Sequence, residues 1–253
     1  MQKWLAILCW LSVVFPAAAD ERELRELFSE RQVQGTLMLS SLKGEQTFIH
    51  NEQRAGQRFT PASTFKILNT LIAVQQGAVS GPDFLFKWSG EHYDFSAWNR
   101  DLTLRDAFQV SCVWCYQRLA SKIGSEVYRQ SLRSLHYGRL QEPFKTTTFW
   151  LDGALKVSAR EQVAFLKAVF RQDLPFSRQA YSTLKSVMLV EKTPAYTLEA
   201  KSGWSNHIGW YIGYVETRDD VWFFALNMDV RDSKRLPLRK SLVLEALKLK
   251  EIL

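Results

Sequence analysis

Strand-like patterns lie at both ends of this 253-residue sequence, while helical patterns fill its middle. Residues 34–42 and 46–50 flank a short turn around Gly44, and residues 208–216 and 221–230 flank a second turn, so each end predicts a β-hairpin. Two hairpins that are far apart in the sequence can form one sheet if the residues between them fold as a separate layer. The sequence therefore predicts an α+β fold, with one antiparallel sheet built from both chain ends, flanking helices and an inserted all-helical subdomain.

The helical segments are recognised by apolar residues at helical spacing. The segment 63–76 is strongly apolar and is followed by Gly77, a residue type common just after a helix C-terminus. Residues 158–170 begin with Ser158 and Glu161 at the spacing of a capping box. Three further segments complete the predicted helices: 21–30, 103–120 and 238–250.

The first nineteen residues have the three parts of a secretory signal peptide. Lys3 lies in a short cationic start, residues 4–15 form an apolar run, and the segment ends in small residues up to Ala19. Spanning a bilayer takes about 20 apolar residues, so this run is short for a retained anchor. We expect cleavage after Ala19, secretion across the inner membrane to the periplasm, and no membrane span in the mature protein.

Residues 20–253 are predicted to form a single domain, because 46% of the sequence is hydrophobic and no linker or low-complexity tract interrupts it. The sheet part is expected at about 20–60 and 195–253, and the helical part at about 61–194.

The charge distribution does not favour a nucleic-acid partner. The formal net charge is +7 and becomes +6 without the signal peptide, but basic and acidic side chains alternate, as in residues 20–31. The sequence has no P-loop, no dinucleotide fingerprint and no zinc-peptidase motif, and its four histidines lie far apart. No metal site is therefore predicted.

Two cysteines, Cys112 and Cys115, remain after the signal peptide and form a Cys-x-x-Cys pattern. A thioredoxin-type redox site would need a neighbouring βαβ unit, whereas these cysteines lie in a predicted helix. The oxidising compartment favours a structural pair, either bridged or free. A bridge between two cysteines three residues apart on a helix would need some strain.

The segment PASTFKIL at residues 61–68 places a lysine one helical turn after a serine, among apolar residues. The Ser-x-x-Lys pattern occurs three times, but only Ser63 and Lys66 combine it with a helix N-terminus and an apolar neighbourhood. Free backbone N–H groups and the helix dipole at such a terminus stabilise developing negative charge. These features suit a serine nucleophile that attacks a carbonyl.

Two further motifs follow in order, Ser111-Cys112-Val113 and Lys201-Ser202-Gly203. With them the chain resembles the class D, or oxacillinase-type, serine β-lactamases of the penicillin-recognising enzymes. The resemblance extends over nearly the whole mature chain. It includes DLTLRDA at 101–107, FWLDG at 149–153, KSGW at 201–204, FFALNMD at 223–229 and LPLRKS at 236–241.

The resemblance implies that Ser63 opens the β-lactam amide to form an acyl-enzyme. Lys66 is implied to carry an N-carboxylate, made from carbon dioxide or bicarbonate, that serves as the general base, and Ser111 to pass a proton to the lactam nitrogen. The backbone N–H groups of Ser63 and Trp204 would form the oxyanion hole. Trp150, Val113 and Phe65 would support the carbamate, and the substrate would contact Lys201, Ser202, Gly203, Arg239 and Tyr137.

An apolar pocket around Lys66 agrees with this chemistry. Burial lowers the pKa of a lysine, and only the neutral amine attacks carbon dioxide. The N–H of Trp150 would then be a donor to a buried anion that would otherwise lack one. For Trp150 or Val113 alone, plain core packing would be the better interpretation, and the surrounding motifs favour the site roles.

The sequence departs from the family pattern at four places. Arg139 follows Tyr137-Gly138 where asparagine is usual, which adds bulk and charge and bears on substrate range. Ser202 stands where threonine is common, and Cys112 beside Ser111 is unusual. The loop between Trp204 and Gly209 is short.

The predicted function is that of an exported β-lactamase that hydrolyses small-molecule β-lactams and thereby confers resistance to them. The sequence leaves the oligomeric state open. The alternative is a β-lactam-sensing or penicillin-binding domain that is acylated without efficient turnover. A cell-wall peptidase would share the serine–lysine chemistry but commonly has more domains or an anchor.

Overall fold

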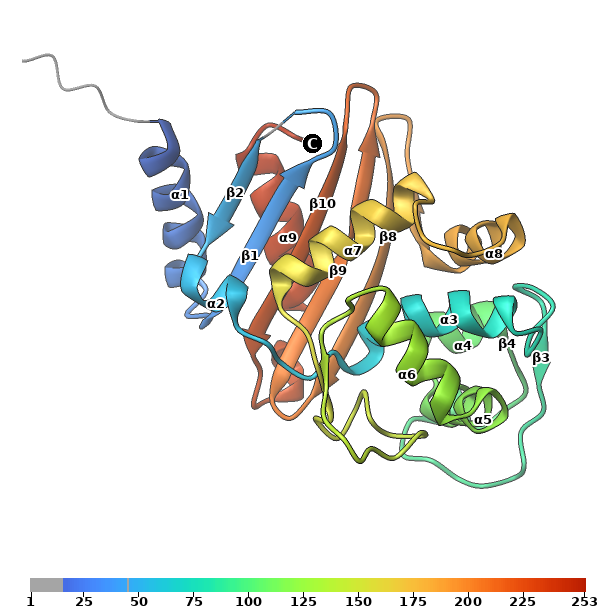
Figure 1. The fold of residues 1–253 in the computed structure, drawn as a ribbon. Coiled ribbons are helices and arrows are strands. Elements are labelled where there is room, and N and C mark those ends of the chain that lie inside the picture. Colours follow the sequence, from blue (N-terminus) through green and yellow to red (C-terminus); the bar gives the residue numbers. More distant parts are fainter. Residues whose placement is uncertain (1–15, 45) are drawn as a thin grey trace, which may run out of the picture.

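A six-stranded antiparallel sheet lies at the centre of the computed structural model, which describes residues 16–44 and 46–253 (Figure 1). The strand order is β2-β1-β10-β9-β8-β7. Both chain ends contribute strands to this sheet, as the sequence predicts. The strands are β1 (Gly35–Ser41), β2 (Thr47–His50), β7 (Leu189–Lys192), β8 (Tyr196–Ser205), β9 (Ile208–Thr217) and β10 (Val221–Asp229).

The pairing of β1 with β10 joins the two ends of the chain. Its register runs from Gly35 opposite Met228 to Ser41 opposite Trp222. The predicted hairpins β1–β2 and β9–β10 are both present. Since β1 lies between β2 and β10, neither end forms the sheet alone.

Helices cover both faces of the sheet. On one face, α1 (Pro16–Glu30) and α9 (Leu238–Leu249) bury apolar side chains such as Leu24, Phe28 and Leu242 against it. On the opposite face lies α7 (Ala159–Arg171), which begins with the capping box predicted at Ser158 (Figure 1). The sheet is therefore the middle layer of three.

The helical lobe packs beside the β8 end of the sheet (Figure 1). Its core helix is α3 (Lys66–Gln75), which continues directly from the 3₁₀ helix η1 (Ala62–Phe65). Two small strand pairs accompany the helices, so the lobe is not purely helical. The other helices are α2 (Glu52–Gly56), α4 (Leu104–Gln109), α5 (Val113–Ile123), α6 (Ser125–Ser134), α8 (Arg178–Met188), η2 (Ser96–Trp98) and η3 (Ser233–Arg235), and the strand pairs are β3 (Leu85–Phe86) with β4 (Leu102–Thr103) and β5 (Arg139–Leu140) with β6 (Leu155–Lys156).

The prediction of one helix over residues 103–120 is wrong. The chain forms α4 and α5 with a break between them, where Ser111 has a left-handed backbone with φ of 57°. The boundaries between the sheet part and the helical part also differ from the expected ones. Helix α7 and strand β7 both fall inside residues 61–194, yet α7 covers the sheet and β7 belongs to it.

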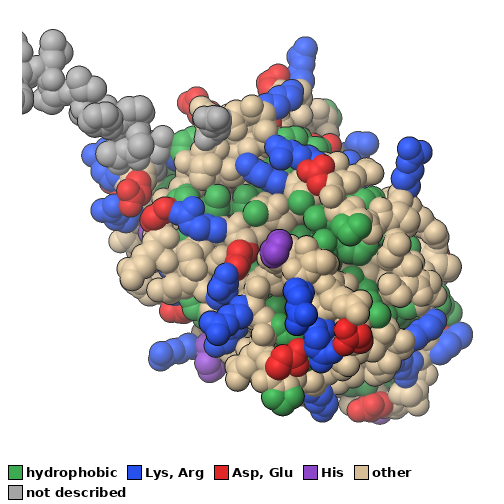
Figure 2. All heavy atoms as spheres, in the orientation of Figure 1, with side chains coloured by type: hydrophobic (Ala, Val, Ile, Leu, Met, Phe, Trp, Pro, Cys, Tyr) green, Lys and Arg blue, Asp and Glu red, His purple; other side chains and the backbone are tan. Residues whose placement is uncertain are grey.

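The charged start and apolar run of the predicted signal peptide, residues 1–15, lie outside the described residues, and its last four residues begin α1. In the described part of the chain, no helix combines the length and the apolar character of a membrane span. Basic and acidic side chains are interspersed over the face drawn in Figure 2.

Helix α8 offers a simple test of the local structure. The exposed Ser177 caps its N-terminus by accepting a hydrogen bond from the Ala180 N–H at 3.2 Å. Replacing Ser177 with alanine should lower the free energy of unfolding by about 1 kcal/mol, because an N–H of the first turn loses its partner. Denaturant unfolding measures the change. Ser177→Asp keeps an acceptor and should stay near the wild type; equal losses in both variants would contradict the cap.

Candidate active site

The side chains of Ser63 and Lys66 meet at the start of the helix that runs through η1 into α3. The Lys66 Nζ donates a hydrogen bond of 3.1 Å to the Ser63 Oγ. Ser63 is 8% exposed and Lys66 only 1%. The one-turn spacing in the sequence thus brings a buried amine against a hydroxyl that is still reachable from solvent, as predicted.

Aromatic side chains surround Lys66. Phe65 stacks on Trp150 with ring centroids 5.7 Å apart, and the Lys66 Nζ lies 4.8 Å from the centroid of the Tyr116 ring. Burial lowers the pKa of Lys66 to about 7, so a neutral amine is accessible near physiological pH.

The Trp150 ring is fully buried, and its Nε1–H has no hydrogen-bond partner in the structure. An unsatisfied buried donor is costly, so this N–H suits an additional acceptor. The backbone of Trp150 also contributes, since its carbonyl accepts a 3.0 Å hydrogen bond from the Ala62 N–H. Ala62 has φ of 51°, a strained value for a residue with a Cβ, directly before the nucleophile.

Ser111 enters the site from the break between α4 and α5. The Ser111 N–H bonds to the Phe108 carbonyl and the Cys112 N–H to the Ala107 carbonyl, which is the Schellman pattern of a helix C-terminus. This turn places the Ser111 Oγ where it accepts a hydrogen bond from the Lys201 Nζ. The second and third motifs therefore meet through their side chains.

Lys201 lies on β8 and is 3% exposed. Its Nζ also donates to the Ser202 carbonyl at 3.0 Å. Burial, and then the positive charges of Lys66 and Arg239, hold the pKa of Lys201 well below its usual value. Three desolvated basic side chains so close together favour an anionic ligand.

Gly203 lets β8 approach the nucleophile. A Cβ on Gly203 would lie 3.2 Å from the Ser63 backbone nitrogen and 2.9 Å from the Pro61 carbonyl oxygen. This contact brings the segment around Gly203 and Trp204 beside the Ser63 N–H, where the oxyanion hole is predicted. The indole of Trp204 is 39% exposed and donates to the Val230 carbonyl at 3.2 Å, so its ring lies outside the core.

The short loop predicted after Trp204 is a two-residue turn. Asn206 and His207 join β8 to β9 with φ values of 49° and 60°, as in a type I′ hairpin.

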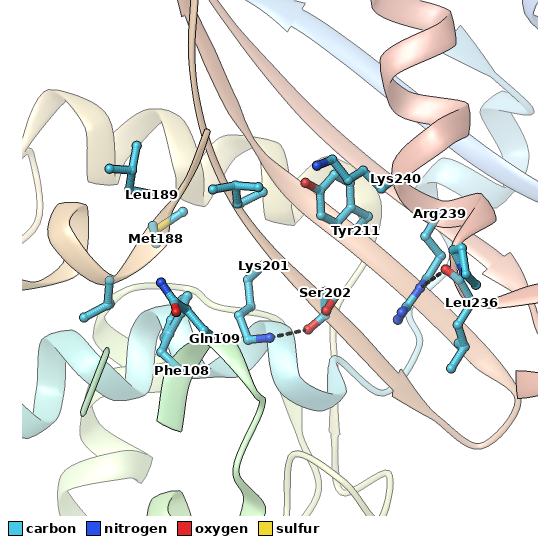
Figure 3. Close-up of a pocket in the computed structure, with 14 residues that line it drawn as sticks. Phe108, Gln109, Met188, Leu189, Lys201, Ser202, Tyr211, Leu236, Arg239 and Lys240 are labelled. Carbon is cyan, nitrogen blue, oxygen red and sulfur yellow. Dashed lines mark hydrogen bonds between the residues drawn. The ribbon is translucent and has the colours of Figure 1, made fainter. Parts of the chain in front are cut away.

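A cavity of about 450 Å³ lies along β8, at the end of the site occupied by Lys201 (Figure 3). Ser202 and Arg239 line it together with Lys201. Arg239 is held by its Nη1–H to the Gly203 carbonyl at 2.6 Å and its Nε–H to the Leu236 carbonyl at 2.8 Å. Burial lowers its pKa to about 10. These groups can bind a carboxylate.

The structure does not place Tyr137 as predicted. Its ring is 2% exposed, and its hydroxyl donates to the Gln162 Oε1 at 3.0 Å behind Phe65. Packing and a buried hydrogen bond hold the side chain in the core, so this placement does not support the predicted contact of Tyr137 with substrate, which stays a prediction. Arg139 is exposed on β5 and lines a different hollow from Lys201. Val113 is half-buried at the first turn of α5.

Sequence reasoning missed two tyrosines at the site. Tyr116, whose ring faces Lys66, lies three residues after Val113, so helical spacing was an available signal. Tyr211 lines the cavity with a buried hydroxyl that has no hydrogen-bond partner among the described residues, and Figure 3 shows its ring between Ser202 and the start of α9. Nothing in the sequence marks it out among the aromatic residues of β9.

Comparison with known proteins identifies the family. Residues 35–248 match the penicillin binding protein transpeptidase domain. β-Lactamase OXA-48 of Klebsiella pneumoniae is 40% identical over 246 residues, which cover 94% of this chain and 93% of the relative. The chain belongs to the class D β-lactamases. Solved structures agree: FUS-1 (OXA-85), a class D β-lactamase from Fusobacterium nucleatum subsp. polymorphum, has a TM-score of 0.88 at 35% identity, covering 92% of this chain and 98% of that one.

A second solved structure, the class D β-lactamase YbXI from Nostoc, has a TM-score of 0.86 at 35% identity and covers 89% of this chain and 97% of its own. The predicted family, fold class and enzyme type are thereby confirmed. As a class D β-lactamase the protein is a hydrolase of cyclic amides.

Gly203 provides a test of the site geometry. Gly203→Ala should lower kcat/KM for β-lactam hydrolysis by about 10²-fold, because the added Cβ would meet backbone atoms of Ser63 and Pro61 and displace β8 from the nucleophile. Steady-state kinetics measure the loss. Gly56→Ala, where a Cβ meets nothing within 4 Å, is the matched control. Full activity of the Gly203 variant would contradict the close approach.

Proposed function

We propose that this class D β-lactamase opens the β-lactam amide through a Ser63 acyl-enzyme, with an N-carboxylated Lys66 as the general base. The observation that carries the proposal is the Lys66 amine, buried at 3.1 Å from the Ser63 Oγ. A protonated lysine at that position could not accept a proton from the serine, so the amine must act either neutral or carboxylated.

The surroundings of Lys66 fit a carboxylated side chain. Burial is the cause of its lowered pKa, so the neutral amine needed for reaction with carbon dioxide is available near pH 7. The Trp150 Nε1–H is a buried donor without a partner in the part of the chain that the structure describes. Carboxylation would supply a basic oxygen at the site and replace a cation near Lys201 with an anion, which relieves the repulsion that lowers the pKa of Lys201.

In acylation, the Ser63 Oγ gives its proton to the carboxylated Lys66 and forms a bond to the lactam carbonyl carbon. The displaced electron pair moves to the carbonyl oxygen, which accepts hydrogen bonds from the Ser63 and Trp204 backbone N–H groups. When the C–N bond breaks, the nitrogen takes its electron pair and a proton from the Ser111 hydroxyl. Lys201, which donates to Ser111, can resupply that proton. The proton that Lys66 took from Ser63 then replaces the one given up by Ser111 and Lys201, so that overall one proton passes from Ser63 to the lactam nitrogen and Lys66 is again a free base.

In deacylation, a water oxygen bonds to the ester carbonyl carbon. The Lys66 side chain takes a proton from the water and returns it to the Ser63 Oγ as the ester C–O bond breaks. The products are the ring-opened acid and free Ser63. A domain that was only acylated would lack this step.

Substrate orientation is assigned to the cationic end of the site. Lys201, Ser202 and Arg239 line the same cavity, and their side chains would bind the carboxylate that β-lactams carry beside the amide (Figure 3). Gly203 contributes the close approach of the strand. We further propose that residues 1–19 direct export to the periplasm, where hydrolysis of β-lactams would confer resistance.

Added bicarbonate tests the role of Lys66. After the enzyme is depleted of carbon dioxide, hydrolysis of a chromogenic cephalosporin should be slow and should rise severalfold with bicarbonate. Lys66→Ala should lose about 10⁴-fold or more in kcat and should not respond, because the base is absent. Stoichiometric release of colour without turnover would indicate a sensing or penicillin-binding domain. Turnover that ignores bicarbonate would overturn carboxylation.

The pH dependence follows from the lowered pKa of Lys66. With a pKa of about 7, the neutral amine predominates above pH 7 and is lost as the pH falls through it. Without added bicarbonate, kcat should therefore fall by about fivefold between pH 7 and 6, and excess bicarbonate should restore part of it.

Trp150→Phe provides the matched variant. It keeps an aromatic ring against Phe65 but removes the indole N–H, so it should need more bicarbonate for half-maximal activity at every pH. A carbon-13 NMR signal from labelled bicarbonate on the protein gives a direct measure of carboxylation. An unchanged bicarbonate requirement would exclude the proposed role of the indole.

A further inference from the structure

Cys112 and Cys115 form a disulfide directly after Ser111. Both cysteines are fully buried. Cys112 is the N-cap of α5 rather than a residue inside a helix, so the bridge closes the entry of α5 and does not span a regular helical turn. The sequence predicts that any bridge would lie within a helix, whereas the structure has the bridge at the start of a helix.

Ser111 needs support where it lies. Its φ of 57° is disfavoured for a residue with a Cβ, and the C′ position of a Schellman turn is usually occupied by glycine. The carbonyls that accept its N–H and that of Cys112 both belong to α4. Those bonds attach the backbone of Ser111 to α4, the helix that precedes it, and the Ser111 side chain accepts a hydrogen bond from Lys201.

The disulfide connects the residue after Ser111 to the first turn of α5, the helix that follows it. Helix α5 is attached to α3 by a buried hydrogen bond of 2.9 Å between the Tyr116 and Thr70 hydroxyls. Trp114 anchors the same turn through a 3.1 Å bond to the Trp98 carbonyl. Because α3 is the helix that begins with Lys66, this path ties the position of Ser111 to that of the catalytic pair.

We propose that the Cys112–Cys115 disulfide is a positioning element for Ser111, which it holds in register with Lys66 and Lys201 for proton delivery to the lactam nitrogen. The inference rests on the proposed role of Ser111. Without the bridge, Ser111 can relax toward an ordinary backbone conformation, and its Oγ then spends less time at the leaving nitrogen. Acylation should suffer, whereas deacylation, which expels Ser63 and not the nitrogen, should not.

Two single variants remove the bridge while each keeps a capping atom for α5. Cys112→Ser leaves an oxygen that can accept the Cys115 N–H, and Cys115→Ala leaves the Cys112 sulfur, which accepts that N–H at 3.2 Å in the structure. Both should lower the acylation rate constant by about tenfold or more, as expected for a misplaced proton donor, with an unchanged deacylation rate constant. Rapid-mixing single-turnover kinetics separate the two steps.

The decisive comparison repeats Cys115→Ala in a Ser111→Ala background. If the bridge acts through Ser111, its removal there should cause no further loss of acylation. An equal loss in both backgrounds would show that the bridge only maintains the fold, and would overturn the proposal. Leu119→Val, a buried change elsewhere on α5, is the control for a general loss of stability, with melting temperatures recorded for all variants.

Failure of the two proposals can be told apart. Ser111→Ala with full acylation activity would remove the proposed role of Ser111, and with it the positioning role. A slow Ser111→Ala variant beside fully active bridge variants would overturn the positioning role alone. If a bridge variant does not fold, reduction of the folded wild type, verified by two additional titratable thiols, must produce the same selective loss of acylation.

Discussion

The burial of one amine shapes this site. The Lys66 side chain is almost completely removed from water and has the Ser63 hydroxyl and aromatic rings as neighbours, so its charged form is destabilised. A lysine of that kind is useful only where its amine has to be neutral or modified. In the proposed mechanism, the aromatic packing of Phe65, Trp150 and Tyr116 is consequently part of the chemistry as well as part of the core.

The site lies where the helical lobe meets the sheet, and each part supplies what the other lacks. The lobe contributes Ser63, Lys66 and Ser111 from helix ends, where backbone N–H groups are available. The sheet contributes Lys201 from β8, a strand whose position is set by its long pairing with β9. Gly203 is the point of closest approach, because any side chain there would separate the strand from Ser63.

Two residues with left-handed backbones flank the reacting groups. Ala62 precedes the nucleophile and Ser111 precedes α5, and neither is a glycine. Such conformations persist only when surrounding contacts hold them. For Ala62 the contact is the Trp150 carbonyl, and for Ser111 it is the end of α4 together with the proposed support from the disulfide. Other non-glycine residues, such as Gln32 and Gln172, also have left-handed backbones, but Ala62 and Ser111 are the two that adjoin the candidate site.

Local patterns in the sequence were sufficient for the hairpins, the strongest helices and the three motifs, because each depends on spacing within one segment: β9 and β10 alternate around a turn, and Ser63 and Lys66 are one helical turn apart. Long-range packing decided the rest. The break between α4 and α5 at Ser111 contains no glycine that would have predicted it. The burial of Tyr137 depends on its hydrogen bond to Gln162, which is distant in the sequence. Helix α7 packs on the sheet and not in the helical lobe. These outcomes depend on which buried groups find partners, and only the folded chain brings those partners together.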